Sequence, residues 1–249
     1  MENDRRTYSQ PDNIPGIPPY RYLYRFISAR RLEDIILSNR LYVPRRGELN
    51  DPFDGKVKLA PHDARKEKDI QDLVDKQMRV LSFSGEETAP TNPLMWSHYA
   101  DGHRGVCLKF DMRIWTPADV AASGYVLDWV RYSKDRPLVD LAHSNAGQEL
   151  PGSAFGPLPQ NIESLHRIAF TKHEDWAYEQ EWRMVCSQRD GKKKIYLSFP
   201  QGALAEVLMG LRMPRKERLG IRRLIERQHQ ALLVSEAQED PTKFRVLAT

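Results

Sequence analysis

Short runs in which apolar residues alternate with polar ones recur along this chain and are joined mainly by loops. The clearest run begins at PYRYLYRFIS, where Tyr20, Tyr22, Tyr24 and Phe26 occupy every second position. A period of two predicts a β-strand. Further strand-like runs are LYVP (41–44), VLSFS (80–84), VCLKFD (106–111), YVLDWVRYS (125–133), IYLSFP (195–200), ALAEVLMG (203–210), and a closing pair at 231–237 and 243–249. Because loops rather than regular helices join most of them, we predict an α+β fold with a mixed, largely antiparallel sheet flanked by helices.

Helical patterns are fewer. RRLEDIILSNR places Leu32, Ile35 and Ile36 on one helical face, with Ser28 as the expected cap. We also predict helices over 62–79, at the start of the run that begins at Leu94, in the first part of 160–176, and in the basic amphipathic segment 215–230.

Length and composition indicate one globular domain. The chain has 249 residues, of which 40% are hydrophobic and 29% charged, with a net charge of +4 that permits a polyanionic partner without requiring one. Residues 1–19 are polar and rich in proline and are predicted to be a flexible arm, so that 20–249 form the domain. A stretch rich in Pro, Gly and Ser at about 133–159 is predicted to be a loop-rich insertion.

The same composition argues against a membrane or secreted protein. The sequence has no apolar stretch of about 18 residues, and its first residues lack the apolar centre of a secretory signal. The two cysteines, Cys107 and Cys186, lie in apolar strand-like runs and are predicted to be reduced core thiols. We therefore predict a cytoplasmic protein with no membrane contact and no metal site.

The stretch from Trp176 to Cys186, WAYEQEWRMVC, is the strongest candidate site. If it is one strand, Glu179, Glu181 and Arg183 share a face that must meet water, a partner or a cleft. The simplest interpretation is that the two glutamates pair with Arg183 and Lys172 on a solvated face. The aromatic residues on both sides of the glutamates favour a cleft.

Two other segments combine polar side chains with apolar anchors. NDPFD contains Asn50 and Asp51, which form either a structural turn or the edge of a pocket. NPLMWSHYADGHRG contains two histidines five residues apart, a spacing unsuited to two metal ligands on one helix. This segment is either a packed element or a pocket wall, formed by Trp96, Ser97, His98 and Tyr99.

Several motifs of known chemistry are absent from the sequence. It has no GxGxxG after a strand, no phosphate-binding GxxxxGK[ST] and no GxSxG nucleophile elbow. The basic segment 215–227 is typical of a solvated helix face, because no aromatic residues are interleaved with its charges.

Taken together, LNDPFD, NPLMWSHYADGHRGVCLKFD, FTKHEDWAYEQEWRMV and ALAEVLMGLRM resemble a bacterial family labelled domain of unknown function 2971. The resemblance covers nearly all of the chain after about residue 20. The family label carries no activity.

The order of parts is also similar, more distantly, to the DNA-modifying ADP-ribosyltransferase toxins of bacteria. Arg25 and LEDIILSNRLYVP resemble their first strand and helix, SFS with NPLMW resembles a middle segment, and Glu181 in EWRMV resembles the glutamate that begins a late strand. Arg25 stands where those toxins carry a histidine pattern, and the Glu179-x-Glu181 form is more typical of arginine-modifying toxins.

This second resemblance implies NAD as the substrate and a toxin or phage-defence role. It implies that Glu181 stabilises the ribose cation, that Glu179 assists the acceptor, and that Arg25 holds the cofactor. Trp96, Ser97, His98 and Tyr99 would also contact the cofactor, and Asn50, Asp51 and Arg183 the substrate. The acceptor would be nucleic acid or protein, with an antitoxin as a further partner. Two alternatives remain open, a non-enzymatic module that binds nucleic acid or protein through the basic helix, and a nuclease.

Overall fold

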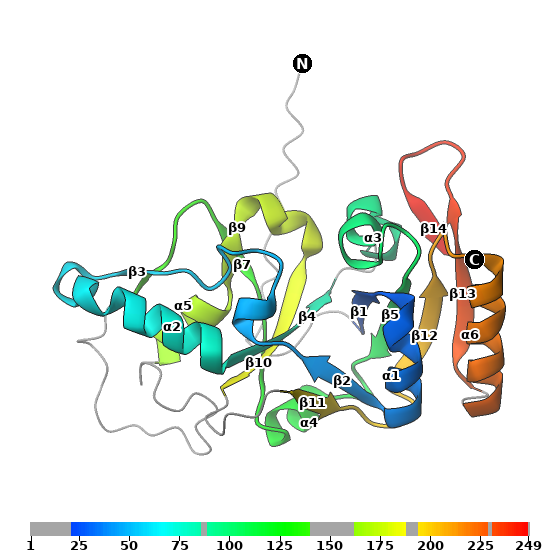
Figure 1. The fold of residues 1–249 in the computed structure, drawn as a ribbon, viewed down its shortest axis with the longest axis horizontal. Coiled ribbons are helices and arrows are strands. Elements are labelled where there is room, and N and C mark those ends of the chain that lie inside the picture. Colours follow the sequence, from blue (N-terminus) through cyan, green and yellow to red (C-terminus); the bar gives the residue numbers. More distant parts are fainter. Residues whose placement is uncertain (1–20, 86–88, 140–161, 188–193, 229–230, 249) are drawn as a thin grey trace.

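The chain folds around one large twisted sheet, seen in a computed structural model that describes residues 21–85, 89–139, 162–187, 194–228 and 231–248 (Figure 1). The predicted arm at 1–19 and most of the predicted insertion at 133–159 lie outside these residues. The sheet has eight strands, in the order β14 (Val246–Ala248), β13 (Leu233–Glu239), β12 (Leu204–Met209), β5 (Val106–Asp111), β1 (Tyr22–Ile27), β4 (Met78–Ser84), β10 (Glu181–Ser187) and β6 (Val126–Trp129).

Neighbouring strands of this sheet are antiparallel except β12 and β13, which are parallel and are connected through helix α6 (Arg215–Gln228). A parallel pair needs such a crossover connection, whereas the antiparallel pairs do not. The predicted α+β class with a mixed, largely antiparallel sheet is confirmed.

Smaller elements surround the sheet. Three two-stranded ladders pair β2 (Arg40–Val43) with β11 (Ile195–Ser198), β3 (Lys58–Leu59) with β8 (Leu138–Val139), and β7 (Arg131–Ser133) with β9 (Thr171–His173). The other α-helices are α1 (Leu32–Ser38), α2 (Glu67–Gln77), α3 (Pro93–Tyr99), α4 (Pro117–Ala122) and α5 (Ile162–Ala169). Short 3₁₀ helices are η1 (Ala29–Arg31), η2 (Arg46–Glu48), η3 (Pro61–Lys66), η4 (Ala89–Thr91) and η5 (Glu174–Glu179).

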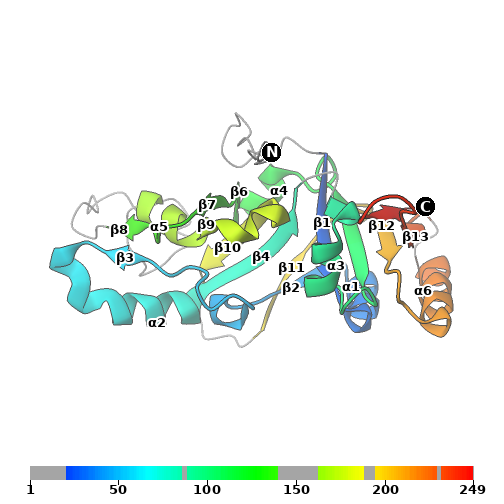
Figure 2. The ribbon, with the colours of Figure 1, turned by 90° about the horizontal axis from the view of Figure 1, so that it is seen from above.

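Helices α2 and α6 lie at opposite ends of the molecule, as both views show (Figure 2). Among the helices of the described residues, none combines the length and the apolar character that crossing a bilayer requires. Helix α1 continues directly from η1, and Ser28 occupies the N-cap position of η1, but its side chain does not make the predicted capping hydrogen bond.

The central strands carry apolar side chains on both faces, and helices cover each face. On one side, Leu23 and Leu108 pack in the largest core cluster with residues of α1 and α6. On the other, Tyr24, Phe26 and Cys107 pack against α3. Both Cys107 and Cys186 are buried free thiols, as predicted.

The sheet is loosest between β1 and β4. These strands share one registered pair, Tyr24 with Ser84, whereas β1 and β5 share six pairs and β4 and β10 share seven. The guanidinium of Arg25 on β1 donates a hydrogen bond to the main-chain carbonyl of Ser82 on β4. The side chain of Arg25 thus connects β1 and β4 across the gap in their main-chain pairing.

Candidate functional site

Two carboxylates meet where η5 passes into β10. Glu179 is the last residue of η5, Gln180 adopts a left-handed conformation with φ 46°, and Glu181 is the first residue of β10. The prediction that Glu179 shares a strand face with Glu181 is therefore wrong, because the strand starts two residues later. Both carboxylates nevertheless converge on the ammonium of Lys172 in β9, whose Nζ lies 2.7 Å from Glu179 and 3.3 Å from Glu181.

Arg183 binds Glu181 from the other side. Its Nε and Nη2 donate to the two carboxylate oxygens at 2.8 and 3.0 Å. The same guanidinium makes a bidentate pair with Asp54, at 2.9 and 2.6 Å, and donates to the carbonyl of Ala169 at 2.8 Å. Arg183 is 1% exposed and therefore anchors Glu181 rather than contacting a substrate.

The predicted pairing is present in part, because both glutamates contact Lys172 but Glu181 alone of the two contacts Arg183, and the pairs are buried rather than solvated. Glu179 and Glu181 are each 4% exposed. A buried ion pair survives only when its desolvation is offset by several close partners, and here each charged group has at least two.

Three buried carboxylates (Asp54, Glu179, Glu181) face two buried cations (Lys172, Arg183). The excess negative charge falls on Glu179, since burial and the charge of Glu181 raise its pKa to about 7. Burial acts the same way on Glu181, but Arg183 and Lys172 outweigh it and hold the pKa of Glu181 well below its ordinary value. The two adjacent carboxylates therefore have well-separated proton affinities.

Hydroxyl groups fix the geometry of this pair. Tyr99 of α3 donates to Glu179, and its oxygen accepts a hydrogen bond from Asn50 at 3.3 Å. The main-chain N–H of Glu181 donates to the Tyr132 hydroxyl at 2.9 Å. Burial, followed by the negative charge of Glu179, raises the pKa of Tyr99, so this phenol is neutral and available as a donor.

The carboxylates line a cavity of about 250 Å³ that lies along the gap between β1 and β4. The cavity brings together six of the sequence-predicted site residues, Arg25, Asn50, His98, Tyr99, Glu179 and Glu181. They come from β1, the loop after η2, α3, η5 and β10, so segments far apart in the sequence form one site. We refer to it as the carboxylate cavity.

Four predicted site residues lie elsewhere. Arg183 is the buried anchor described above. Trp96 is fully buried and packs edge-on against Phe26, so its predicted position in the pocket wall is wrong. The Ser97 hydroxyl lies 3.1 Å from Nε2 of His103 and is not among the residues that line the carboxylate cavity.

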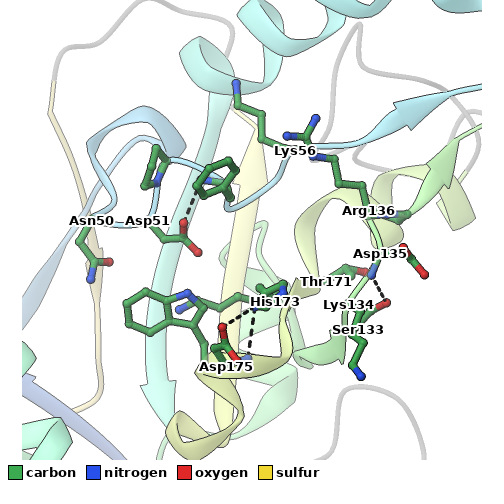
Figure 3. Close-up of a pocket in the computed structure, with 15 residues that line it drawn as sticks. Asn50, Asp51, Lys56, Ser133, Lys134, Asp135, Arg136, Thr171, His173 and Asp175 are labelled. Atoms are coloured by element: carbon green, nitrogen blue, oxygen red, sulfur yellow. Dashed lines mark hydrogen bonds and ion pairs between the residues drawn. The ribbon is translucent and has the colours of Figure 1, made fainter.

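The fourth, Asp51, stabilises a turn, because its Oδ1 accepts the N–H of Phe53 at 2.9 Å. It also lines a second cavity of about 610 Å³, which we call the outer cavity (Figure 3). Both expectations for the NDPFD segment, a turn and a pocket edge, are thus met by one residue.

The outer cavity shares Asn50 and Lys172 with the carboxylate cavity, so the two are neighbours. Its walls combine an exposed ring, Phe53, with Trp176, whose ring centroid lies 4.6 Å from the ammonium of Lys172. Figure 3 shows Lys56 and Arg136, two of its cationic side chains, on the side away from Asn50.

Sequence reasoning missed Asp54 and underestimated Lys172. Asp54 ends the NDPFD segment that the sequence singled out, and its spacing from Arg183 is 129 residues, so no local pattern joins them. From the sequence, Lys172 is expected only as a partner of the glutamates on a solvated strand face. Its position in FTKHEDW, just before the aromatic run, is the one signal that could have drawn attention to it.

Residues 95–184 match the family model described as protein of unknown function (DUF2971). The match includes the MWSHYA and YEQEWRM segments on which the resemblance rested, and it confirms that resemblance over these residues. A search of curated proteins found no match.

Among solved structures, the chain is similar to the Thermus sp. 2.9 protein DarT in complex with NAD⁺, at 11% sequence identity and a TM-score of 0.36. The alignment covers 88% of this chain and 96% of that one. At that score and identity, the similarity supports no statement about chemistry.

Proposed function

We propose that this protein is an NAD-dependent ADP-ribosyltransferase whose reaction takes place in the carboxylate cavity. The observation that carries the proposal is the pair of adjacent carboxylates with separated proton affinities, since such pairs divide acid-base and electrostatic roles between them. In the reaction, the bond from the ribose to the nicotinamide nitrogen breaks and its electron pair leaves with nicotinamide. A lone pair of the acceptor then forms the new bond to the ribose carbon.

Glu181 would stabilise the transition state. Cleavage of this bond makes the ribose resemble an oxocarbenium ion, as in glycoside hydrolysis. Glu181 is ionised at every physiological pH and is held by Arg183 and Lys172, so its charge is in place before the reaction begins.

Glu179 would accept the proton of the acceptor. With a pKa of about 7 it can take up a proton near neutral pH, and Tyr99 and Lys172 keep its carboxylate oriented. Its second role is electrostatic, because its ionisation leaves the buried cluster with an uncompensated negative charge beside the developing ribose cation.

Other residues in and beside the carboxylate cavity would bind NAD, the donor of the ADP-ribose group. The guanidinium of Arg25 has further N–H groups besides the one that donates to the Ser82 carbonyl. Its planar arrangement of donors suits phosphate oxygens. His98, Tyr99, Trp176 and Tyr178 form an aromatic cluster in which the centroid of the His98 ring lies 6.2, 6.2 and 6.3 Å from the other three centroids. We assign His98 and Tyr99 to the nicotinamide side.

The acceptor would approach through the outer cavity, which adjoins Glu179 through Lys172. The exposed ring of Phe53 among cationic side chains favours nucleic acid over protein as the acceptor, since bases stack on rings and phosphates pair with Lys and Arg. A role as a toxin or phage-defence effector, with an antitoxin as partner, is the biological setting that we infer for such an activity.

The test is incubation of the purified protein with labelled NAD and separate protein, RNA and DNA acceptors. We expect NAD consumption and label transfer by the wild type, and a loss of about 10²–10³-fold or more in Glu181→Gln, the scale of removing one preorganised electrostatic group. Glu174→Gln, a surface change in η5, is the matched control and should retain full activity.

Two results would contradict the proposal. One is a wild type that consumes no NAD with any acceptor, and the other is a Glu181→Gln variant with full activity. Salt-dependent nucleic-acid binding that survives Glu181→Gln but is lost in Arg222→Gln/Arg223→Gln would instead indicate a binding module. Metal-dependent strand cleavage would indicate a nuclease.

A further inference from the structure

We propose that a third cavity, between β1, α1 and the β2–β11 ladder, binds the adenosine diphosphate half of the dinucleotide. This inference rests on the proposed function, but it concerns a separate set of residues. The cavity has a volume of about 400 Å³ and is lined by Arg25, Arg30, Arg31, Tyr42, Lys194 and Tyr196, over an apolar floor. We call it the basic cavity.

The carboxylate cavity is too small for the whole substrate. Sites for drug-sized ligands usually measure about 300–1,000 Å³. A cavity of about 250 Å³ can take nicotinamide and its ribose, but a complete dinucleotide needs more space. The additional space must begin where the diphosphate would leave the carboxylate cavity.

The basic cavity begins at that point. Arg25 lines both cavities, so one guanidinium stands at their junction. Along β2 and the residue after it, Tyr42 lines the basic cavity and Pro44 lines the carboxylate cavity. The Tyr42 hydroxyl donates at 2.5 Å to Glu48, which lines the carboxylate cavity. The two cavities are therefore consecutive along β2, which lies beside α1 in Figure 1.

The charges of the basic cavity suit an anionic ligand. Four cations line it, Arg25, Arg30, Arg31 and Lys194, against one carboxylate, Asp34. Asp34 already has a cationic neighbour, since Arg40 lies 3.6 Å from it. Within the part of the chain that the structure describes, no carboxylate lies within 4.0 Å of the guanidinium of Arg30 or Arg31.

The cations also repel one another. Burial and then the charge of Arg31 lower the pKa of Arg25 to about 10, while Glu181 acts in the opposite direction, so the two guanidinium groups repel each other. A diphosphate between them would remove this repulsion and offer each fork a set of phosphate oxygens.

The remaining walls suit a nucleoside. Ile27, Ile35 and Leu41 form an apolar floor, each at most 6% exposed. Tyr42 and Tyr196 form an edge-to-face pair with ring centroids 5.7 Å apart, and Tyr196 is 38% exposed. A planar base can lie on the apolar floor beside this ring while its phosphates point toward Arg25 and Arg31.

The experiment compares ligands that contain different halves of the dinucleotide. ADP-ribose carries the adenosine diphosphate half, and nicotinamide mononucleotide lacks adenosine. We expect Arg30→Gln/Arg31→Gln to weaken ADP-ribose binding at least 10-fold by calorimetry, and nicotinamide mononucleotide binding by less than twofold. Arg223→Gln/Arg227→Gln, which removes two exposed cations of α6, is the matched control and should bind both ligands as the wild type does.

A second variant, Tyr196→Ala, should also weaken ADP-ribose selectively. Wild-type protein that does not bind ADP-ribose, or unchanged ADP-ribose affinity in Arg30→Gln/Arg31→Gln, would overturn the assignment. Failure of the proposed function has a different signature, namely absence of NAD turnover while arginine-dependent ADP-ribose binding persists. In that case the basic cavity remains a nucleotide site.

Discussion

Replacing Glu179 by glutamine should change the pH dependence of stability, because the fold raises the pKa of this carboxyl group. Its pKa is raised from the ordinary value of 4.5 to about 7 by burial and by Glu181. One pKa unit corresponds to about 1.4 kcal/mol, so the folded state favours the protonated form by about 3 kcal/mol relative to the unfolded chain. Glutamine cannot ionise and so removes this free-energy difference, but it keeps the size of the side chain and an oxygen that accepts the hydrogen bond of Tyr99.

The sign of the effect follows from proton counting. Between pH 4.5 and about 7 the folded protein binds more protons at Glu179 than the unfolded chain does. Its contribution to stability is therefore fully present below about pH 4.5 and is lost as the pH rises through about 7. Relative to Glu179→Gln, the wild type should lose about 3 kcal/mol of unfolding free energy over this range.

Urea denaturation of both proteins at several pH values from about 4.5 to 8.5 measures this difference. Titration of the other acidic groups cancels in the comparison, and Glu174→Gln, an exposed neighbour in η5, should show no pH-dependent difference from the wild type. A constant difference between wild type and Glu179→Gln across the range would refute the electrostatic description of the cluster.

Two further predictions concern the framework around the site. Asp54→Asn breaks one side of a buried bidentate pair and leaves Arg183 undercompensated, which should cost about 3 kcal/mol in chemical denaturation, whereas Asp72→Asn at an exposed pair should change nothing. If both cost the same, the buried cluster does not stabilise the fold as described. Gly105→Ala places a methyl group 2.2 Å from a main-chain oxygen of β1 and should lower the melting temperature strongly, whereas Gly220→Ala in α6 meets no atom within 4 Å and should raise stability by about 0.5–1 kcal/mol. Equal melting temperatures for the two alanine variants would contradict this.

Local patterns predicted most strands and helices correctly because alternation and helical spacing are short-range properties. The run containing Tyr22, Tyr24 and Phe26 forms β1, and the closing strands pair as β13 and β14. The same reasoning failed at Glu179, where a left-handed residue, Gln180, ends a 3₁₀ turn immediately before the strand. Such a conformation is uncommon for a residue other than glycine, and no periodicity announces it.

The environment of the site was harder to predict than its members. Charged residues on a strand normally face solvent, so Glu181 and Arg183 appeared to need water or a cleft. Their burial depends on Asp54 and Lys172, which reach them only through the folded topology. Trp96 shows the converse case, since an aromatic residue beside polar neighbours was placed at the pocket but packs in the core instead.

The single registered pair between β1 and β4 has a mechanical consequence. A sheet resists shear through its rows of main-chain hydrogen bonds. These rows are long between β1 and β5 and between β4 and β10, but between β1 and β4 they are reduced to the one pair of Tyr24 with Ser84. In a pulling experiment, the half of the sheet formed by β4, β10 and β6 should separate from the half formed by β1, β5, β12, β13 and β14 before either half unfolds. The carboxylate cavity lies along the gap between β1 and β4, so a ligand that bridges it would act as a cross-link and raise the force at which the halves separate.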